Sequence, residues 1–117
     1  MPTLLVTVEA EFHSAHQLPG YGGACSRIHG HTYRLAVTLA GEPDAETGMV
    51  IDFAELQAMV DEKVVSVLDH RLLNEVVSPP TAENIARWIW ERLKADMPQL
   101  TEVKVYETSQ CYVTYRG

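Results

Sequence analysis

The chain opens with a segment in which apolar and polar residues alternate, from Thr3 to Phe12. The apolar positions share one parity, and they are Leu4, Val6, Val8, Ala10 and Phe12. A period of two predicts a β-strand with one buried face. Residues 13–28 are rich in Gly, Ser and Pro, and we expect a loop there.

Alternation returns between His29 and Leu39, which predicts a second strand that ends at the Gly-Glu-Pro-Asp break of residues 41–44. A hairpin is expected near the end of the chain, with its second strand at residues 112–115. On the first strand of this hairpin, Glu107 has the same parity as two valines, at a position where an apolar residue is expected.

Two helices are predicted between these pairs of strands. Asp52 is a good N-cap for the first helix, whose apolar residues follow at helical spacing and are Phe53, Leu56, Val60, Val64 and Leu68. Thr81 caps the second helix, and Pro98 ends it; its apolar stripe is Ile85, Ile89, Leu93 and Met97. Trp88 and Trp90 are expected to pack on this helix rather than to stack on a ligand.

The element order ββααββ keeps strands and helices apart in the sequence. This order predicts the α+β class, with a four-stranded antiparallel sheet and both helices on one of its faces. The length of 117 residues fits a single domain, residues 1–117. Because a core of this size is small relative to its surface, self-association is an expected source of further burial.

The net charge and the targeting signals limit which kinds of partner and which compartment we expect for this chain. The net charge of −7 disfavours binding to nucleic acid, which depends on neutralising phosphates. The sequence contains no signal peptide and no apolar run long enough to span a bilayer. We therefore expect a cytoplasmic protein without a membrane partner, and both cysteines in the reduced state.

The richest chemistry lies in three histidines, His16, His29 and His31. Residues i and i+2 of a strand point to one face, so the Cβ atoms of His29 and His31 lie roughly 6–7 Å apart and their imidazole nitrogens can converge on one ion. His16 follows the first strand, and an antiparallel neighbour could bring it alongside. Three imidazoles with an open fourth position match a catalytic zinc site. The alternative is that the pair consists of unrelated surface histidines.

The two cysteines have different surroundings. Cys25 lies in a polar loop four residues before His29, where a nearby cation or metal would lower its pKa and make it a base or a nucleophile. Its alternative role is that of a small buried apolar residue. Cys111 has no such neighbours, and we expect it to pack within a strand.

Other polar residues admit two interpretations each. Asp69 either orients His70 and raises its basicity, or the pair closes the end of the first helix. Glu107 either points inward to meet N–H groups of a ligand ring, or lies at a wet edge. Arg27 and Arg34 are candidates for a phosphate contact, against the alternative of solvated surface arginines.

An ordered set of motifs resembles the 6-pyruvoyl-tetrahydropterin synthase superfamily over nearly the whole chain. In chain order the motifs are Phe12-His-Ser-Ala-His16, Cys25-x-x-x-His29-Gly-His31, Asp52-Phe53, Leu68-Asp69-His70, Pro80-Thr81-x-Glu83-Asn84 and Tyr106-Glu107-Thr108. Three residues separate Cys25 from His29, as in the bacterial 6-carboxy-tetrahydropterin synthases of queuosine biosynthesis. The pyruvoyl synthases resemble this pattern with a longer gap.

The resemblance implies a role for each motif. The histidines would bind Zn²⁺, Cys25 would be the general base, and Asp69 and His70 its relay. The substrate-binding residues would be Glu107, which holds the pterin ring, together with Thr81, Glu83 and Arg27. The implied reaction converts 7,8-dihydroneopterin triphosphate to 6-carboxy-5,6,7,8-tetrahydropterin, with loss of acetaldehyde and triphosphate.

The resemblance also implies the tunnelling fold, in which trimers close a β-barrel and two trimers stack into a homohexamer with active sites between subunits. Two alternatives stay open at this point. One is a 6-pyruvoyl-tetrahydropterin synthase or another relative that cleaves the pterin side chain. The other is a module that binds a metal or a pterin without catalysis.

Overall fold

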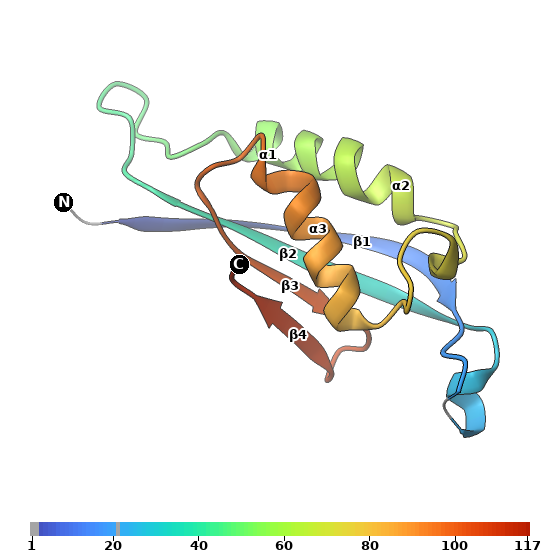
Figure 1. Ribbon diagram of the computed structural model, residues 1–117. Coiled ribbons are helices and arrows are strands. Elements are labelled where there is room, and N and C mark those ends of the chain that lie inside the picture. Colours follow the sequence, from blue (N-terminus) through green and yellow to red (C-terminus); the bar gives the residue numbers. More distant parts are fainter. Residues whose placement is uncertain (1–2, 21) are drawn as a thin grey trace.

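The computed structural model describes residues 3–20 and 22–117, apart from the side chain of Cys25. The four strands of this described part are β1 (Leu4–His16), β2 (His29–Gly41), β3 (Leu100–Tyr106) and β4 (Tyr112–Tyr115). They form one antiparallel sheet in the order β1-β2-β3-β4. The helices lie together on one face of this sheet (Figure 1), which confirms the predicted α+β fold.

The first helical region consists of three consecutive segments, α1 (Phe53–Val60), the π-helix η2 (Asp61–Val65) and α2 (Ser66–Leu68). The second is α3 (Ala82–Lys94), and short 3₁₀ turns form η1 (Gly23–Ser26) and η3 (Leu73–Glu75). The Asp52 carboxylate accepts the N–H of Ala54 at 2.8 Å, and the Thr81 hydroxyl accepts the N–H of Asn84 at 3.2 Å. Both predicted N-caps are confirmed.

The core lies between the sheet and the helices. One face of β1 and β2 supplies its largest aromatic pair, Phe12 and Tyr33, which are fully buried and stack at a ring distance of 4.9 Å. The predicted stripe of the second helix is buried as well, but α3 ends at Lys94 and not at Pro98, so Met97 packs into the core from the turn that follows the helix. Trp88 and Trp90 pack against the edge of this core, as predicted.

Phe53 departs from the predicted stripe of the first helix. Its side chain is 64% exposed and lies outside the core cluster, whereas the stripe is buried from Leu56 onward. A row of residues four apart drifts by ~40° per step around an α-helix. The wider π-helical turn of η2 offsets this drift, which keeps both Val64 and Leu68 buried.

The end of β1 also differs from the prediction, because residues 13–16 belong to the strand and not to a loop. Both edges of this segment are paired. His16 lies opposite His29 of β2 in the register. At the other edge, the N–H of His70 donates to the carbonyl of His13 at 2.6 Å. The N–H of Ala15 donates to the carbonyl of Arg71 at 3.0 Å. Pairing on both sides holds a strand that its polar composition does not predict.

The prediction that Cys111 packs within a strand is wrong. Cys111 is exposed and precedes β4, in the turn that joins it to β3. Its main-chain carbonyl accepts the N–H of Glu107 at 3.0 Å, so the residue shapes the turn through its backbone.

The described residues span 54 × 24 × 23 Å, and the long strands β1 and β2 set the long dimension. At the end where β1 finishes and β2 begins, the strands reach toward the projecting turn η1 (Figure 1). No helix in the described part of the chain has both the length and the apolar character needed to cross a membrane.

Candidate metal centre

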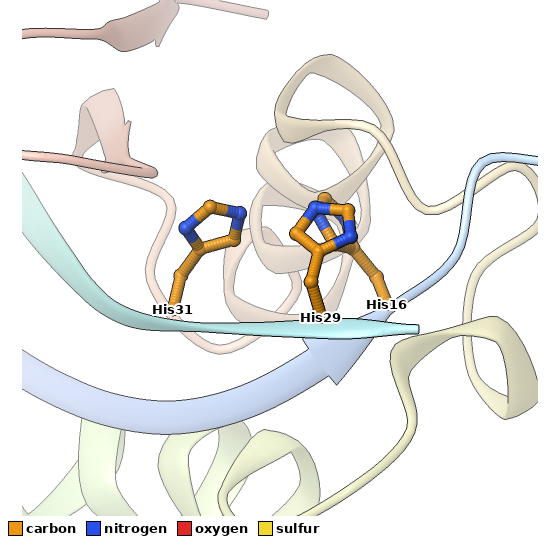
Figure 2. A group of neighbouring side chains, drawn as sticks. All are labelled: His16, His29 and His31. Carbon is orange, nitrogen blue, oxygen red and sulfur yellow. The ribbon is translucent and has the colours of Figure 1, made fainter. Parts of the chain in front are cut away.

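The three histidines of the predicted metal site come together where β1 ends and β2 begins. His16 lies opposite His29, and His31 lies two residues further along β2. The ring centroids are 4.5 Å apart for His16 and His29, 5.1 Å for His16 and His31, and 5.0 Å for His29 and His31. Figure 2 shows the three side chains rising from the two strands on the same side. Within the described residues, they form the only group of three or more side chains arranged to hold a metal ion.

His16 is the best-supported member of this triad. Its side chain is only 1% exposed, and its Nδ1 lies 2.9 Å from the carbonyl oxygen of Pro80. The hydroxyl of Tyr33 lies 3.2 Å from the same nitrogen. Because a carbonyl oxygen can only accept, Nδ1 of His16 carries the proton and Nε2 presents a lone pair.

His29 is held in the same way. Its Nδ1 lies 2.8 Å from the carbonyl oxygen of Arg27, so this nitrogen also carries the proton. The two Nε2 atoms of His16 and His29 are 3.0 Å apart. Two lone pairs at this distance repel unless a cation lies between them. Neutral imidazoles fixed by carbonyl acceptors are the usual ligands of zinc in proteins, so the donor set fits this metal.

The third imidazole, His31, is favoured in its neutral form. Burial lowers the pKa of His31, His16 and His29 lower it further, and the carboxylate of Glu107 opposes them. Its Nε2 is buried and has no hydrogen-bond partner among the described residues. A neutral, unpartnered nitrogen is what a metal ligand requires before the ion arrives.

Glu107 follows β3 and points to the triad, as its parity predicts. Its Oε1 lies 3.2 Å from Nε2 of His16 and 3.4 Å from Nε2 of His31. The side chain is 32% exposed. The carboxylate therefore lies at the border between the metal site and solvent, where a ligand can reach it.

Asp69 and His70 form a second polar pair, at the edge of β1 that faces away from β2. Asp69 Oδ2 lies 2.8 Å from His70 Nδ1, and Asp69 Oδ1 accepts the backbone N–H of His13 at 2.8 Å. Both contacts lower the pKa of Asp69, and the hydrogen bond from the backbone of His13 has the larger effect. The 2.8 Å contact favours the interpretation in which the carboxylate orients the imidazole, and the catalytic role stays a prediction.

This pair lies away from the triad of its own chain. The His70 ring contacts that of His13, with centroids 6.1 Å apart, and His13 is exposed on the face of β1 opposite to His16. An open pocket of about 560 Å³ lies here, and its lining includes His13, Thr32 and His70 together with His31 of the triad.

For the other predicted site residues, the structure gives fewer side-chain contacts near the triad. The backbone of Cys25 belongs to η1, and its side chain lies outside the described part of the structure. Arg27 is exposed and reaches the site through its carbonyl. Thr81 caps α3 directly after Pro80, and Glu83 is exposed in the first turn of that helix.

Arg34, the other candidate for a phosphate contact, is engaged within the sheet. Its guanidinium lies 4.0 Å from the centre of the Tyr106 ring, and its Nε lies 3.7 Å from the carboxylate of Glu9.

Two supports of the metal site were not predicted from the sequence, Tyr33 and the carbonyl of Pro80. Tyr33 shares the parity of the two histidines on β2, so its position beside the site could have been inferred. The role of Pro80 depends on the approach of α3 to the end of β1, which no local pattern encodes.

Comparisons with known proteins agree with this architecture. The sequence pattern of the family described as "6-pyruvoyl tetrahydropterin synthase" matches residues 5–117. A 6-carboxy-5,6,7,8-tetrahydropterin synthase from Synechocystis is 41% identical over 118 residues, which cover 95% of this chain and 92% of the relative. The human 6-pyruvoyl tetrahydrobiopterin synthase is 42% identical over 98 residues, which cover 76% of this chain and 66% of the relative.

A solved structure extends the likeness to three dimensions. The 6-pyruvoyl tetrahydropterin synthase of Caenorhabditis elegans superposes with a TM-score of 0.88 at 32% identity, covering 100% of this chain and 97% of the other. The agreement of sequence pattern, sequence identity and fold shows that the chain belongs to the 6-pyruvoyl tetrahydropterin synthase family.

Proposed function

We propose that this chain is a zinc-dependent carbon–carbon lyase that converts 7,8-dihydroneopterin triphosphate and one water molecule to 6-carboxy-5,6,7,8-tetrahydropterin, acetaldehyde and triphosphate. The observation that carries the proposal is the convergence of His16, His29 and His31, with lone pairs of two rings facing each other at 3.0 Å. In a member of this family, such a site is suited to hold the ion that acts on the substrate.

The roles of the residues follow from their chemistry. The three imidazoles leave a metal position open to ligand, and bound zinc would polarise the side-chain hydroxyls of the substrate as a Lewis acid. Cys25 would take the proton from the substrate side chain. Asp69 would hold the His70 ring in one orientation through the 2.8 Å contact, so that this imidazole can relay the proton.

Recognition of the ring falls to Glu107, whose partly exposed carboxylate can accept two N–H groups of a pterin edge. Thr81, Glu83 and Arg27 are proposed as further contacts, the first two from the start of α3 and the third from beside His29. The reaction would supply the carboxy-pterin to queuosine and 7-deazapurine biosynthesis in the cytoplasm.

The carboxy product is favoured over the pyruvoyl product by the short gap of three residues between Cys25 and His29. The pyruvoyl synthase is the second candidate, because the human enzyme of that name is as similar in sequence as the carboxy synthase from Synechocystis. The two differ in which bond of the substrate side chain breaks, so the product distinguishes them.

The proposed enzyme works as a homohexamer of single-domain chains, residues 1–117, with each active site shared between copies. Asp69 and His70 lie at the edge of β1 that faces away from β2, with His70 beside the exposed ring of His13, whose side chain lies on the face opposite to His16. The pair would therefore serve the triad of a neighbouring chain. The edge of β1 also exposes Leu4 and Leu5, at 50% and 65%, which a partner strand would cover.

Metal analysis and acetaldehyde release test the proposal together. We expect the wild-type protein to bind one zinc ion per chain and His31→Ala to lose it. His13→Ala is the matched control, because this histidine is exposed on the opposite face, and it should keep the metal. Cys25→Ala should keep zinc and release no acetaldehyde. A full complement of zinc in His31→Ala, or acetaldehyde release at the wild-type rate by Cys25→Ala, would contradict these assignments.

A further inference from the structure

The carboxylate of Glu107 lies at a metal–ligand spacing from two of the three histidines. Two atoms bound to one tetrahedral zinc ion, each at 2.0–2.1 Å, are ~3.3 Å apart. Glu107 Oε1 is 3.2 Å from Nε2 of His16 and 3.4 Å from Nε2 of His31. The Nε2 atoms of His16 and His29 are 3.0 Å apart. The carboxylate therefore borders the same point in space as the imidazole nitrogens.

Hydrogen bonding with His16 does not account for this position. Nδ1 of His16 carries its proton toward Pro80, so its Nε2 offers a lone pair and not a donor. A carboxylate is also an acceptor, and two acceptors 3.2 Å apart repel. Nor does hydrogen bonding with His31 account for it, because among the described residues the buried Nε2 of His31 has no hydrogen-bond partner. A cation at this point removes the repulsion.

Glu107 has no competing charge partner. No lysine or arginine of residues 3–20 and 22–117 forms an ion pair with it. Its backbone is fixed where β3 ends, since its N–H donates to the carbonyl of Cys111 at 3.0 Å. A divalent ion held by three neutral imidazoles keeps its full charge in a partly buried site, and one carboxylate would halve that charge.

We propose that Glu107 is a metal-contacting group of the substrate-free site, and that it leaves the ion when its carboxylate takes the N–H edge of a pterin ring. The proposal rests on the zinc centre and the pterin-binding role given under the proposed function. Binding of the pterin ring by Glu107 and release of a coordination position on the metal ion then occur together. The ion gains a free position for the side-chain hydroxyls only after the correct ring has bound.

Zinc affinity without any pterin tests the first half. We expect Glu107→Gln to bind zinc about tenfold or more weakly than the wild type, measured by competition with a chelator, which is the range for lost supporting groups at zinc sites. Glu11→Gln removes the same charge from an exposed position of β1 and should bind like the wild type. Circular dichroism of each variant confirms that it is folded.

Unchanged zinc affinity in Glu107→Gln would overturn this inference and leave the proposed function intact. A wild-type protein that binds no zinc would overturn both. An equal loss in Glu11→Gln would assign the effect to overall charge and would also overturn the inference.

Cobalt substitution tests the second half. The probe is unsubstituted pterin, which has the ring but no side-chain hydroxyls to bind the metal. Saturating pterin should shift the visible spectrum of the Co²⁺-loaded wild type toward that of Co²⁺-loaded Glu107→Gln, and should leave the spectrum of the variant unchanged. A wild-type spectrum that pterin leaves unchanged, while fluorescence reports that pterin is bound, would show that the carboxylate does not leave. If no pterin binds at all, the switch fails together with the proposed role of Glu107 in ring binding.

Discussion

The polar residues of the candidate site differ in the number of contacts that fix their side chains. His16 is fixed on three sides, by its strand, by the carbonyl of Pro80 and by Tyr33. His70 is exposed and adopts a φ of 57°, a left-handed backbone conformation that histidine tolerates better than most residues. Its imidazole is oriented by one neighbour, Asp69. The metal ligands are thus preorganised, whereas the relay pair depends on one carboxylate.

The ionised form of Asp69 should stabilise the fold in a pH-dependent way. Contacts from His13 and His70 lower its pKa below the usual 3.8. A lowered pKa in the folded state means that the stabilisation is complete above 3.8 and is lost as the pH falls through the lower, folded value. The free energy of unfolding of the wild type should therefore exceed that of Asp69→Asn at about pH 6, and the difference should shrink toward about pH 3. Urea unfolding at a series of pH values measures it, and a difference that does not change with pH would contradict the assignment.

At the scale of helices and strands, the start of α3 has two roles, since it caps the helix and contacts a histidine of the candidate metal site. Thr81 caps the helix, and the preceding residue, Pro80, holds His16 through its carbonyl. The cap contributes to stability and also fixes the backbone that orients a metal ligand. A loss of activity on replacing Thr81 is therefore expected even without a direct contact to substrate.

Two substitutions of Thr81 separate these effects. Thr81→Ala should lower the free energy of unfolding by about 1 kcal/mol, as for a lost N-cap, and weaken zinc binding. Thr81→Ser keeps a hydroxyl that can accept the N–H of Asn84, so it should restore both properties. Thermal unfolding and chelator competition measure them. If the serine variant loses as much stability as the alanine variant, the capping account is wrong.

The first helical region offers a matched pair of substitutions. Leu68 is fully buried, and Leu68→Ala should cost about 2–5 kcal/mol of unfolding free energy. Phe53 is 64% exposed, and Phe53→Ala should change it by at most about 0.5 kcal/mol. Chemical denaturation compares the two. A large loss at Phe53 would place this residue in a contact that the single chain lacks, such as one with a second copy.

Most of the fold could be predicted from local patterns. Alternation identified the strands, and the caps at Asp52 and Thr81 marked where both helices begin. The end of β1 could not be predicted, because residues 13–16 are held by partners 13 to 64 positions away, such as His29 and Pro80. The exposure of Cys111 was missed for a similar reason, since the length of the final turn decides where β4 begins.

Some parts of the candidate site could be predicted from the sequence in more detail than others. The triad followed from spacing and parity, because β1 and β2 are neighbours in an antiparallel pair. The parity of Glu107 with the valines of β3 left two orientations open, inward or at a wet edge, and the structure has the inward one just after β3 ends. Its approach to the histidines, at 3.2 Å and 3.4 Å, depends on how the sheet twists and could not be inferred from one strand.

For the chain as a whole, the central question is how the triad and the Asp69–His70 pair meet. Within the described residues, the pair contacts His13 at the edge of β1, and no hydrogen bond or ion pair joins it to the triad, so we expect the proposed active site to require two copies. Mixing two inactive variants tests this directly. Cys25→Ala and His70→Ala should each be inactive alone, whereas co-expressed chains should recover about one quarter of the wild-type activity, because a quarter of the shared sites receive both intact residues.

The alternative, an active site within one chain, predicts no recovery in the mixture. Analytical ultracentrifugation of the same samples should give the mass of a hexamer. A monomer with full activity would contradict the shared site.

The most direct test of the proposed function is the mass of the pterin formed when the zinc-loaded protein is incubated with 7,8-dihydroneopterin triphosphate. The account predicts 6-carboxy-5,6,7,8-tetrahydropterin, with one acetaldehyde released for each substrate consumed, and no product from zinc-free protein. A 6-pyruvoyl product without acetaldehyde would contradict the carboxy assignment, and an unchanged substrate would contradict the proposed enzyme altogether.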